Sequence, residues 1–119
     1  MGGRAVHKNL DVWNNSIGFV TDIYNITKAY PKEELYGLTN QLRRAAVSIP
    51  SNIAEGAARR SNKEFVQFLY ISLGSCAEVE TQLTISKNLG YAYNANIYDD
   101  LQRIKRMLLG LIKKRKNES

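Results

Sequence analysis

Few side chains in this sequence of 119 residues could carry out covalent or metal chemistry. It contains one cysteine, Cys76, and one histidine, His7. These are too few for a Cys/His zinc site or for the Glu-x-x-His pairs of a di-iron bundle, and there is no second histidine to activate Cys76 as a nucleophile. We expect Cys76 to be a buried, inert thiol and His7 to be exposed to solvent.

Motifs for cofactors and phosphates are also missing from the sequence. It has neither a G-x-x-x-x-G-K-[ST] loop nor a G-x-G-x-x-G fingerprint. The pair Asp99–Asp100 is more typical of a helix start, where acids complement the helix dipole, than of catalysis. The sequence therefore predicts no catalytic residue, metal site, cofactor or small-molecule substrate, and a protein that is not an enzyme.

Basic residues are the most abundant functional candidates. Lysine and arginine number 17 against 11 acidic residues, for a net charge of +6. Such a surface favours nucleic acid, bound through its backbone without a sequence-reading motif. For the last four cations, at 113–116, the alternative to a nucleic-acid site is a solvated helix end, where positive charge complements the helix dipole. The candidate nucleic-acid-binding residues are Arg43, Arg44, Arg59, Arg60, Lys63, Arg103, Arg106, Lys113, Lys114, Arg115 and Lys116.

A seam of polar residues forms a second candidate site. Its members recur at helical spacing beside an apolar stripe, with one carboxylate added from the next helix. They are Gln41, Arg44, Ser48, Asn52, Glu55 and Glu78. The seam is either a solvated face or a subunit interface, and the sequence supports both hypotheses equally. If Arg44 is buried, a carboxylate must lie near it.

The elements that position these residues are four predicted helices. Apolar residues recur at helical spacing over residues 9–28, from 32–38 to 59, from 61 to 90, and from 94–96 to 114. The second helix keeps its phase across Pro50, so we expect it to be continuous but kinked there. Short connections favour antiparallel neighbours, which predicts an all-α, up-down-up-down four-helix bundle. The fourth helix shows a regular seam of Ile97, Leu101, Ile104, Leu108 and Leu111.

The chain is expected to form a single domain over residues 1–119, with 1–8 and 113–119 frayed or flexible. Within the third helix, the small residues at 74–77 suggest close approach of a neighbour, so Gly74→Leu should overpack the fold. The longest run without charge has only 13 residues, at 65–77, and the N-terminus lacks an apolar signal core. We therefore expect no membrane contact and a cytoplasmic location.

Three stretches carry a resemblance to a known family. They are LDVW at 10–13, YPKEELYGLTNQLRRAAVSIPSNIAEG at 30–56, and RRSNKEFVQFLYISLGSCAEVETQL at 59–83. The chain resembles the four-helix-bundle proteins encoded in bacterial 23S rRNA intervening sequences, most specifically in SIPSNIAEG at 48–56. The resemblance implies an antiparallel four-helix bundle without known catalytic residues. It also suggests a homopentamer, as in the related accessory variability determinant of diversity-generating retroelements, which binds nucleic acid and partners a reverse transcriptase.

Two functional hypotheses follow from these observations. The first is a non-enzymatic oligomer, a pentamer by the resemblance, that binds RNA or DNA non-specifically through a basic surface. The alternative is a protein–protein scaffold or accessory subunit that docks an acidic protein or a polymerase such as a reverse transcriptase.

Overall fold

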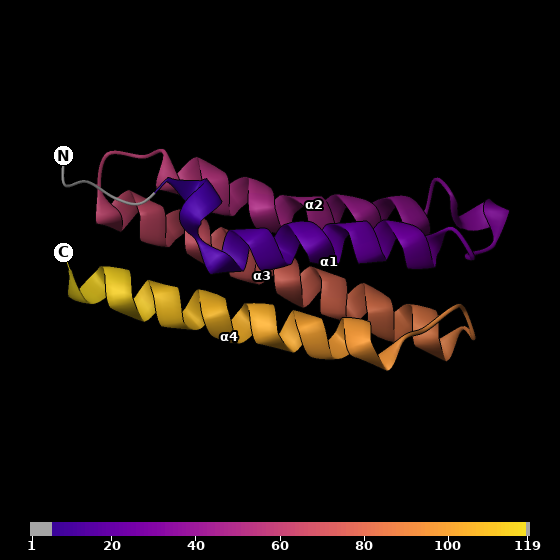
Figure 1. The fold of residues 1–119 in the computed structure, drawn as a ribbon. Coiled ribbons are helices and arrows are strands. Elements are labelled where there is room, and N and C mark those ends of the chain that lie inside the picture. The colour runs from indigo at the N-terminus through magenta and orange to yellow at the C-terminus, as the bar shows by residue number, and fades with distance from the viewer. Residues whose placement is uncertain (1–5, 119) are drawn as a thin grey trace.

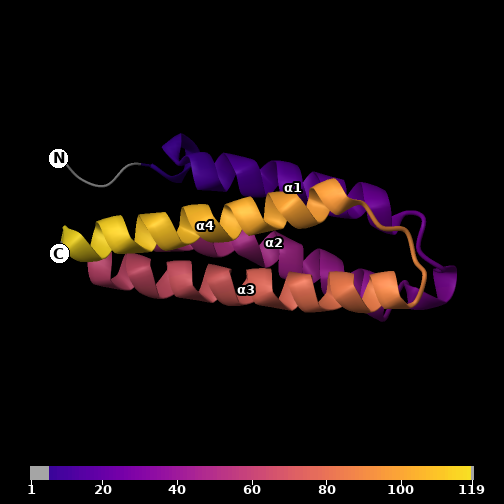
Figure 2. The ribbon, with the colours of Figure 1, turned by 90° about the horizontal axis from the view of Figure 1, so that it is seen from below.

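The computed structural model describes residues 6–118, whose long elements are all α-helices (Figure 1). Consecutive helices run in opposite directions, and the bundle measures 49 × 22 × 19 Å (Figure 2). The predicted all-α, up-down-up-down bundle is therefore confirmed. The helices are α1 (Asp11–Thr27), α2 (Leu38–Ala57), α3 (Asn62–Asn88) and α4 (Ala95–Asn117), with short 3₁₀ turns at His7–Asn9 and Lys32–Glu34.

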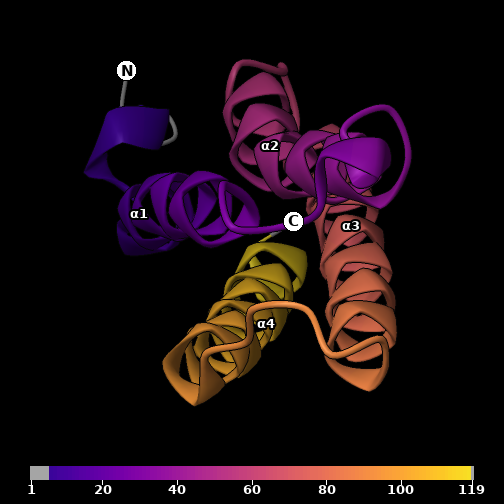
Figure 3. The same ribbon diagram turned by 90° about the vertical axis from the view of Figure 1, so that its right-hand side faces the viewer.

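The core lies along the bundle axis, and each helix packs against two neighbours (Figure 3). In α4 the predicted seam is buried from Ile97 to Leu108. The buried seam ends at Ile112 and not at the predicted Leu111. Ile112 is buried, whereas Leu111 is only partly buried at the edge of the core. The heptad-like spacing of apolar residues thus determines which face of α4 points inward.

The helix ends use local signals that the sequence contains. The Ser61 hydroxyl accepts a hydrogen bond from the Glu64 amide at 3.2 Å, and Asn94 caps α4 in the same way through the Asn96 amide at 2.8 Å. After α3, Gly90 adopts a φ of +79°, a conformation that favours glycine. These signals set the length of each connection and so the antiparallel arrangement.

Helix α2 continues through Pro50 without a break. Side chains of α3 bind this segment directly. The Ser72 hydroxyl donates to the Ile49 carbonyl at 2.8 Å, and the hydroxyls of Ser48 and Ser75 share a hydrogen bond of 2.8 Å. Small hydroxyl side chains therefore bring α2 and α3 together where proline has removed a backbone donor.

The described parts of both terminal segments contain helical turns. Residues 113–117 form the end of α4. Near the N-terminus, the His7 ring is partly covered, with its centroid 5.0 Å from that of Trp13. Residues 1–5 and 119 lie outside the described residues. None of the described helices has both the length and the apolar character needed to cross a membrane.

Gly74 does not lie at a close helix contact within the chain. A Cβ at this position would meet no atom within 4 Å, and the residue is exposed. The expectation that Gly74→Leu overpacks the fold is therefore wrong for the single chain. Its neighbour Cys76 is buried as predicted, and burial raises the pKa of its thiol to about 12.

An ion pair between Glu80 and Lys105 joins the outer edges of α3 and α4. Lys105 Nζ lies 2.8 Å from Glu80 Oε1, and the Tyr98 hydroxyl donates to Glu80 Oε2 at 3.1 Å. The hydrogen bond from Lys105 holds the pKa of Glu80 below its ordinary value of 4.5. The folded state therefore gains stability from this carboxylate above that pH and loses it as the pH falls through the lowered pKa.

We expect Glu80→Gln to lower the free energy of unfolding by about 0.5–1 kcal/mol at pH 7, because the pair is partly exposed. The difference from the wild type should shrink as the pH falls below 4.5 and vanish once the pH is below the lowered pKa, where the folded wild-type carboxylate is protonated too. Urea unfolding across a pH series measures this. Glu33→Gln is the control, with the same charge change at an exposed carboxylate outside the three ion pairs of the described residues. An equal wild-type advantage at pH 7 and at pH 3 would contradict the prediction.

Candidate nucleic-acid interface

Two groups of cations that are distant in the sequence meet at one end of the bundle. One group occupies the turn between α2 and α3, and the other the last turn of α4 (Figure 1). They meet because α3 and α4 are antiparallel neighbours, so that the start of α3 packs against the end of α4 (Figure 2). We call these residues the basic end: Arg59, Arg60, Lys63, Lys113, Lys114, Arg115 and Lys116.

Two arginines of the basic end are held by neighbouring side chains. Arg59 Nη2 lies 3.2 Å from Glu55 Oε2, and its guanidinium lies 4.7 Å from the centre of the Phe68 ring. Arg115 Nη1 lies 2.9 Å from Glu118 Oε1. These contacts orient the two guanidinium groups and neutralise part of the local charge.

The remaining cations of the basic end are accessible to a ligand. All are exposed and make no ion pair with the described residues. An exposed ammonium or guanidinium group can contact a phosphate without first breaking a protein contact. These residues are Arg60, Lys63, Lys113, Lys114 and Lys116.

The opposite end of the bundle has no excess of cations. Arg43 lies there, because its Nε donates to Thr27 at the end of α1. Five carboxylates at this end balance five cations: Asp22, Glu33, Glu34, Asp99 and Asp100 against Lys28, Lys32, Arg43, Arg44 and Lys87. The net positive charge is thus concentrated at the basic end of the 49 Å axis, which attracts an approaching polyanion.

Other predicted cations lie away from the basic end. Arg43 is half-buried between α1 and α2, where its Nε donates to Thr27 Oγ1 at 2.9 Å and its guanidinium lies 4.7 Å from the centre of the Tyr24 ring. This residue packs one helix against another. Arg44 lines a groove between α2 and α3, and Arg106 is exposed partway along α4.

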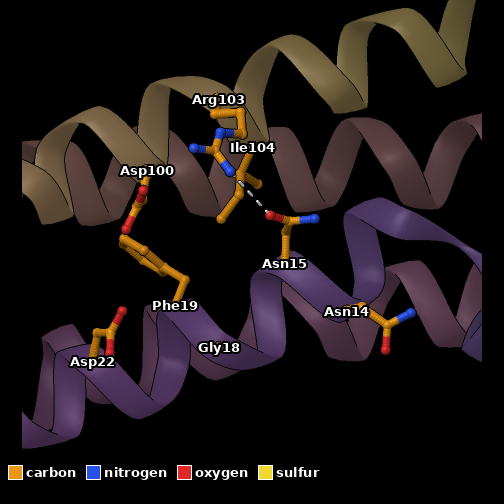
Figure 4. Close-up of a pocket in the computed structure, with 8 residues that line it drawn as sticks. All are labelled: Asn14, Asn15, Gly18, Phe19, Asp22, Asp100, Arg103 and Ile104. Carbon is orange, nitrogen blue, oxygen red and sulfur yellow. Dashed lines mark hydrogen bonds between the residues drawn. The ribbon is translucent and has the colours of Figure 1, made fainter.

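Arg103 lies beside a groove between α1 and α4 (Figure 4). Its Nη1 donates to Asn15 Oδ1 at 3.5 Å. The carboxylates of Asp22 and Asp100 line the same groove, which makes it unsuitable for phosphate. No sequence motif marks this groove, because helices at opposite ends of the chain form it. Among the described residues, no cluster of His, Cys, Asp or Glu could hold a metal ion.

Most of the predicted polar seam lines a groove between α2 and α3. Gln41, Arg44, Ser48 and Glu78 line it together with Gln82, which the spacing of the seam did not predict. Arg44 is exposed and makes no ion pair with any described residue. Gln82 is only 9% exposed, and its Oε1 is buried without a hydrogen-bond partner.

The other two seam residues extend this face. Asn52 Nδ2 donates to Ser48 Oγ at 2.9 Å, whereas Glu55 lies farther along α2 and pairs with Arg59. Exposed aliphatic residues accompany the polar ones, since Val47 on α2 is 39% exposed and Ile71 on α3 is 51% exposed. We call the residues of this groove with Val47, Ile71 and Gly74 the α2–α3 face.

A family model described as 23S rRNA-intervening sequence protein matches residues 8–110. The chain belongs to the 23S rRNA-intervening sequence protein family. The resemblance inferred from the sequence is thereby confirmed. The family match includes the turn between α2 and α3 but ends before Lys113, so the second half of the basic end lies outside it.

A solved structure supports the fold of this intervening-sequence protein. It is a crystal structure of a protein with unknown function from the S23 ribosomal protein family of Bacteroides thetaiotaomicron. The two chains share 27% sequence identity and superpose with a TM-score of 0.78, over 86% of this chain and 95% of the other. No curated protein matches the chain.

Proposed function

We propose that this intervening-sequence protein is a non-enzymatic, oligomeric protein of the cytoplasm that binds RNA or DNA through its basic end. The proposal rests on one observation: the α2–α3 turn lies close to the end of α4. This proximity concentrates seven cations, of which five are exposed without an ion pair among the described residues. The opposite end has no excess of cations, so a polyanion is attracted most strongly to this site.

Binding of this kind is expected to depend on phosphates rather than on base sequence. The exposed groups are mostly lysines, which act as point charges, and the sequence contains no element that reads base edges. Each neutralised phosphate releases counterions, so the logarithm of the affinity should fall linearly with the logarithm of the salt concentration.

A salt titration of the wild-type protein tests this proposal. Fluorescence anisotropy with labelled RNA and DNA oligonucleotides of scrambled sequence should show similar affinities for different sequences and a slope of about −3 to −4 for five contacts. A four-helix bundle of net negative charge is the control. An affinity no stronger than that of the control at low salt would contradict nucleic-acid binding.

The α2–α3 face supports the oligomeric part of the proposal. It combines exposed aliphatic side chains, the unpaired Gln82 Oε1 and the open space at Gly74. A second copy of the chain would cover the aliphatic residues and supply partners for the polar ones. The family resemblance suggests that five copies assemble.

Light scattering measures the assembly directly. We expect a mass that is a multiple of the 13.5 kDa chain. Ile71→Lys should lower that mass, whereas Leu109→Lys should not, although both residues are 51% exposed in the single chain. A wild-type protein that is monomeric at micromolar concentration would contradict oligomerisation.

A protein–protein scaffold is the second candidate function, favoured by the same unpaired groups on the α2–α3 face. An acidic protein or a polymerase such as a reverse transcriptase would then be the partner. Pull-down from native lysate with and without nuclease separates the two functions. A partner retained after nuclease treatment but lost with Ile71→Lys supports the scaffold, and partners released by nuclease support nucleic-acid binding.

A further inference from the structure

One exposed aromatic side chain lies among the cations of the basic end. Tyr70 on α3 is 48% exposed, and Lys116 Nζ from α4 lies 6.0 Å from the centre of its ring. The other aromatic residues of α3 near this end are less accessible, since Phe65 is fully buried and Phe68 is partly buried beneath Arg59. Tyr70 is therefore the ring that a ligand bound at the basic end can reach.

Tyr70 shares a helix face with one of the accessible cations. Lys63, Gln67 and Tyr70 follow each other at spacings of four and three residues, and all three are exposed. Two helical turns, about 10 Å, separate Lys63 from Tyr70 along α3. Cations thus lie on two sides of the ring, Lys63 on its own helix and Lys116 on the neighbouring one.

We infer that Tyr70 is a stacking site for an unpaired base, so that the basic end binds single-stranded RNA or DNA in preference to duplex. The inference rests on the proposed nucleic-acid binding. Every unpaired base offers a π face, and stacking on an aromatic ring is sequence-tolerant. In a duplex these faces are covered by neighbouring base pairs, so a duplex can use only the cations. Lys63 and Lys116 would then hold the phosphates on either side of the stacked base.

The chain supplies a matched control for this site. Tyr36 is 90% exposed, but it lies at the opposite end of the bundle, near Glu33 and Glu34. A tyrosine in acidic surroundings offers a ring without neighbouring phosphate contacts. Tyr36→Ala therefore removes the same side chain without touching the proposed site.

The experiment compares three RNA ligands of equal length in anisotropy titrations: a single strand, a duplex, and a single strand with abasic sites. We expect the single strand to bind most tightly. Tyr70→Ala should weaken its binding on the order of 10-fold, with the salt slope unchanged, because stacking involves no phosphate. Binding of the duplex and of the abasic strand should not change, and Tyr36→Ala should leave all three affinities at their wild-type values.

A second variant reports on stacking independently of affinity. Tyr70→Trp in a Trp13→Phe background places the one indole of the chain at the site. Its fluorescence should be quenched by the single strand and not by the abasic strand. Equal affinity for single strand and duplex, or no quenching, would overturn the stacking site while leaving the proposed function in place. If none of the three ligands binds, the proposed function fails as well.

Discussion

Gly56→Ala is expected to destabilise the bundle by about 1–3 kcal/mol, because the added methyl group has no space. A Cβ at this position would lie 2.6 Å from Phe68 Cβ, 3.0 Å from Phe65 Cδ1 and 3.2 Å from the Phe65 carbonyl oxygen. Two of these atoms belong to the α3 backbone or sit directly on it, so no side-chain rotation can relieve the contact. Helices α2 and α3 would have to separate near the turn that connects them.

Gly110→Ala is the matched control for this prediction. No atom lies within 4 Å of a Cβ at Gly110, and the residue lies inside a helix, so alanine should stabilise the chain by up to about 1 kcal/mol. Urea unfolding followed by circular dichroism measures both changes. The two glycines should thus respond in opposite directions to the same substitution. A Gly56→Ala protein as stable as the wild type would show that α2 and α3 do not approach closely there.

Most of the fold follows from local patterns in the sequence. The seam of Ile97, Leu101, Ile104 and Leu108 determines the buried face of α4, and Ser61 and Gly90 set the ends of α3. The contacts between helices do not follow in the same way. Whether a glycine faces a neighbour depends on the rotation of each helix about its axis, to within a fraction of a turn. For this reason the four small residues at 74–77 suggested a close contact at Gly74, whereas Ser75 is the residue of this stretch that meets α2, and the glycine that faces a neighbour is Gly56.

The candidate site was predictable in part. The sequence identified both groups of cations, and the predicted topology already implies that the α2–α3 turn and the end of α4 lie at the same end of the bundle. Which cations pack against other side chains and which stay exposed could not be predicted. Arg43 contacts Thr27 across the α1–α2 interface, and its neighbour Arg44 lies in a different groove. Adjacent residues on a helix point about 100° apart, so one can pack while the next stays exposed.

Neutralising four cations of the basic end is expected to weaken nucleic-acid binding on the order of 100-fold at 0.1 M salt. The variant combines Arg60→Gln, Lys63→Gln, Lys113→Gln and Lys114→Gln, all at exposed residues without an ion pair among the described residues. If each contacts one phosphate of a single strand, the salt slope should decrease by about 3. Anisotropy titrations at several salt concentrations measure both quantities.

The control variant carries the same net charge but changes other cations: Lys28→Gln, Lys32→Gln, Lys87→Gln and Arg106→Gln. If binding responds only to net charge, both variants lose the same affinity. If the basic end is the site, the control keeps nearly the wild-type slope, because the slope counts cations in contact with phosphate rather than total charge. Equal slopes for the two variants would therefore refute the location even if both proteins bind more weakly. If the salt slope decreases in the first variant and not in the control, the phosphate contacts lie where the α2–α3 turn approaches the end of α4.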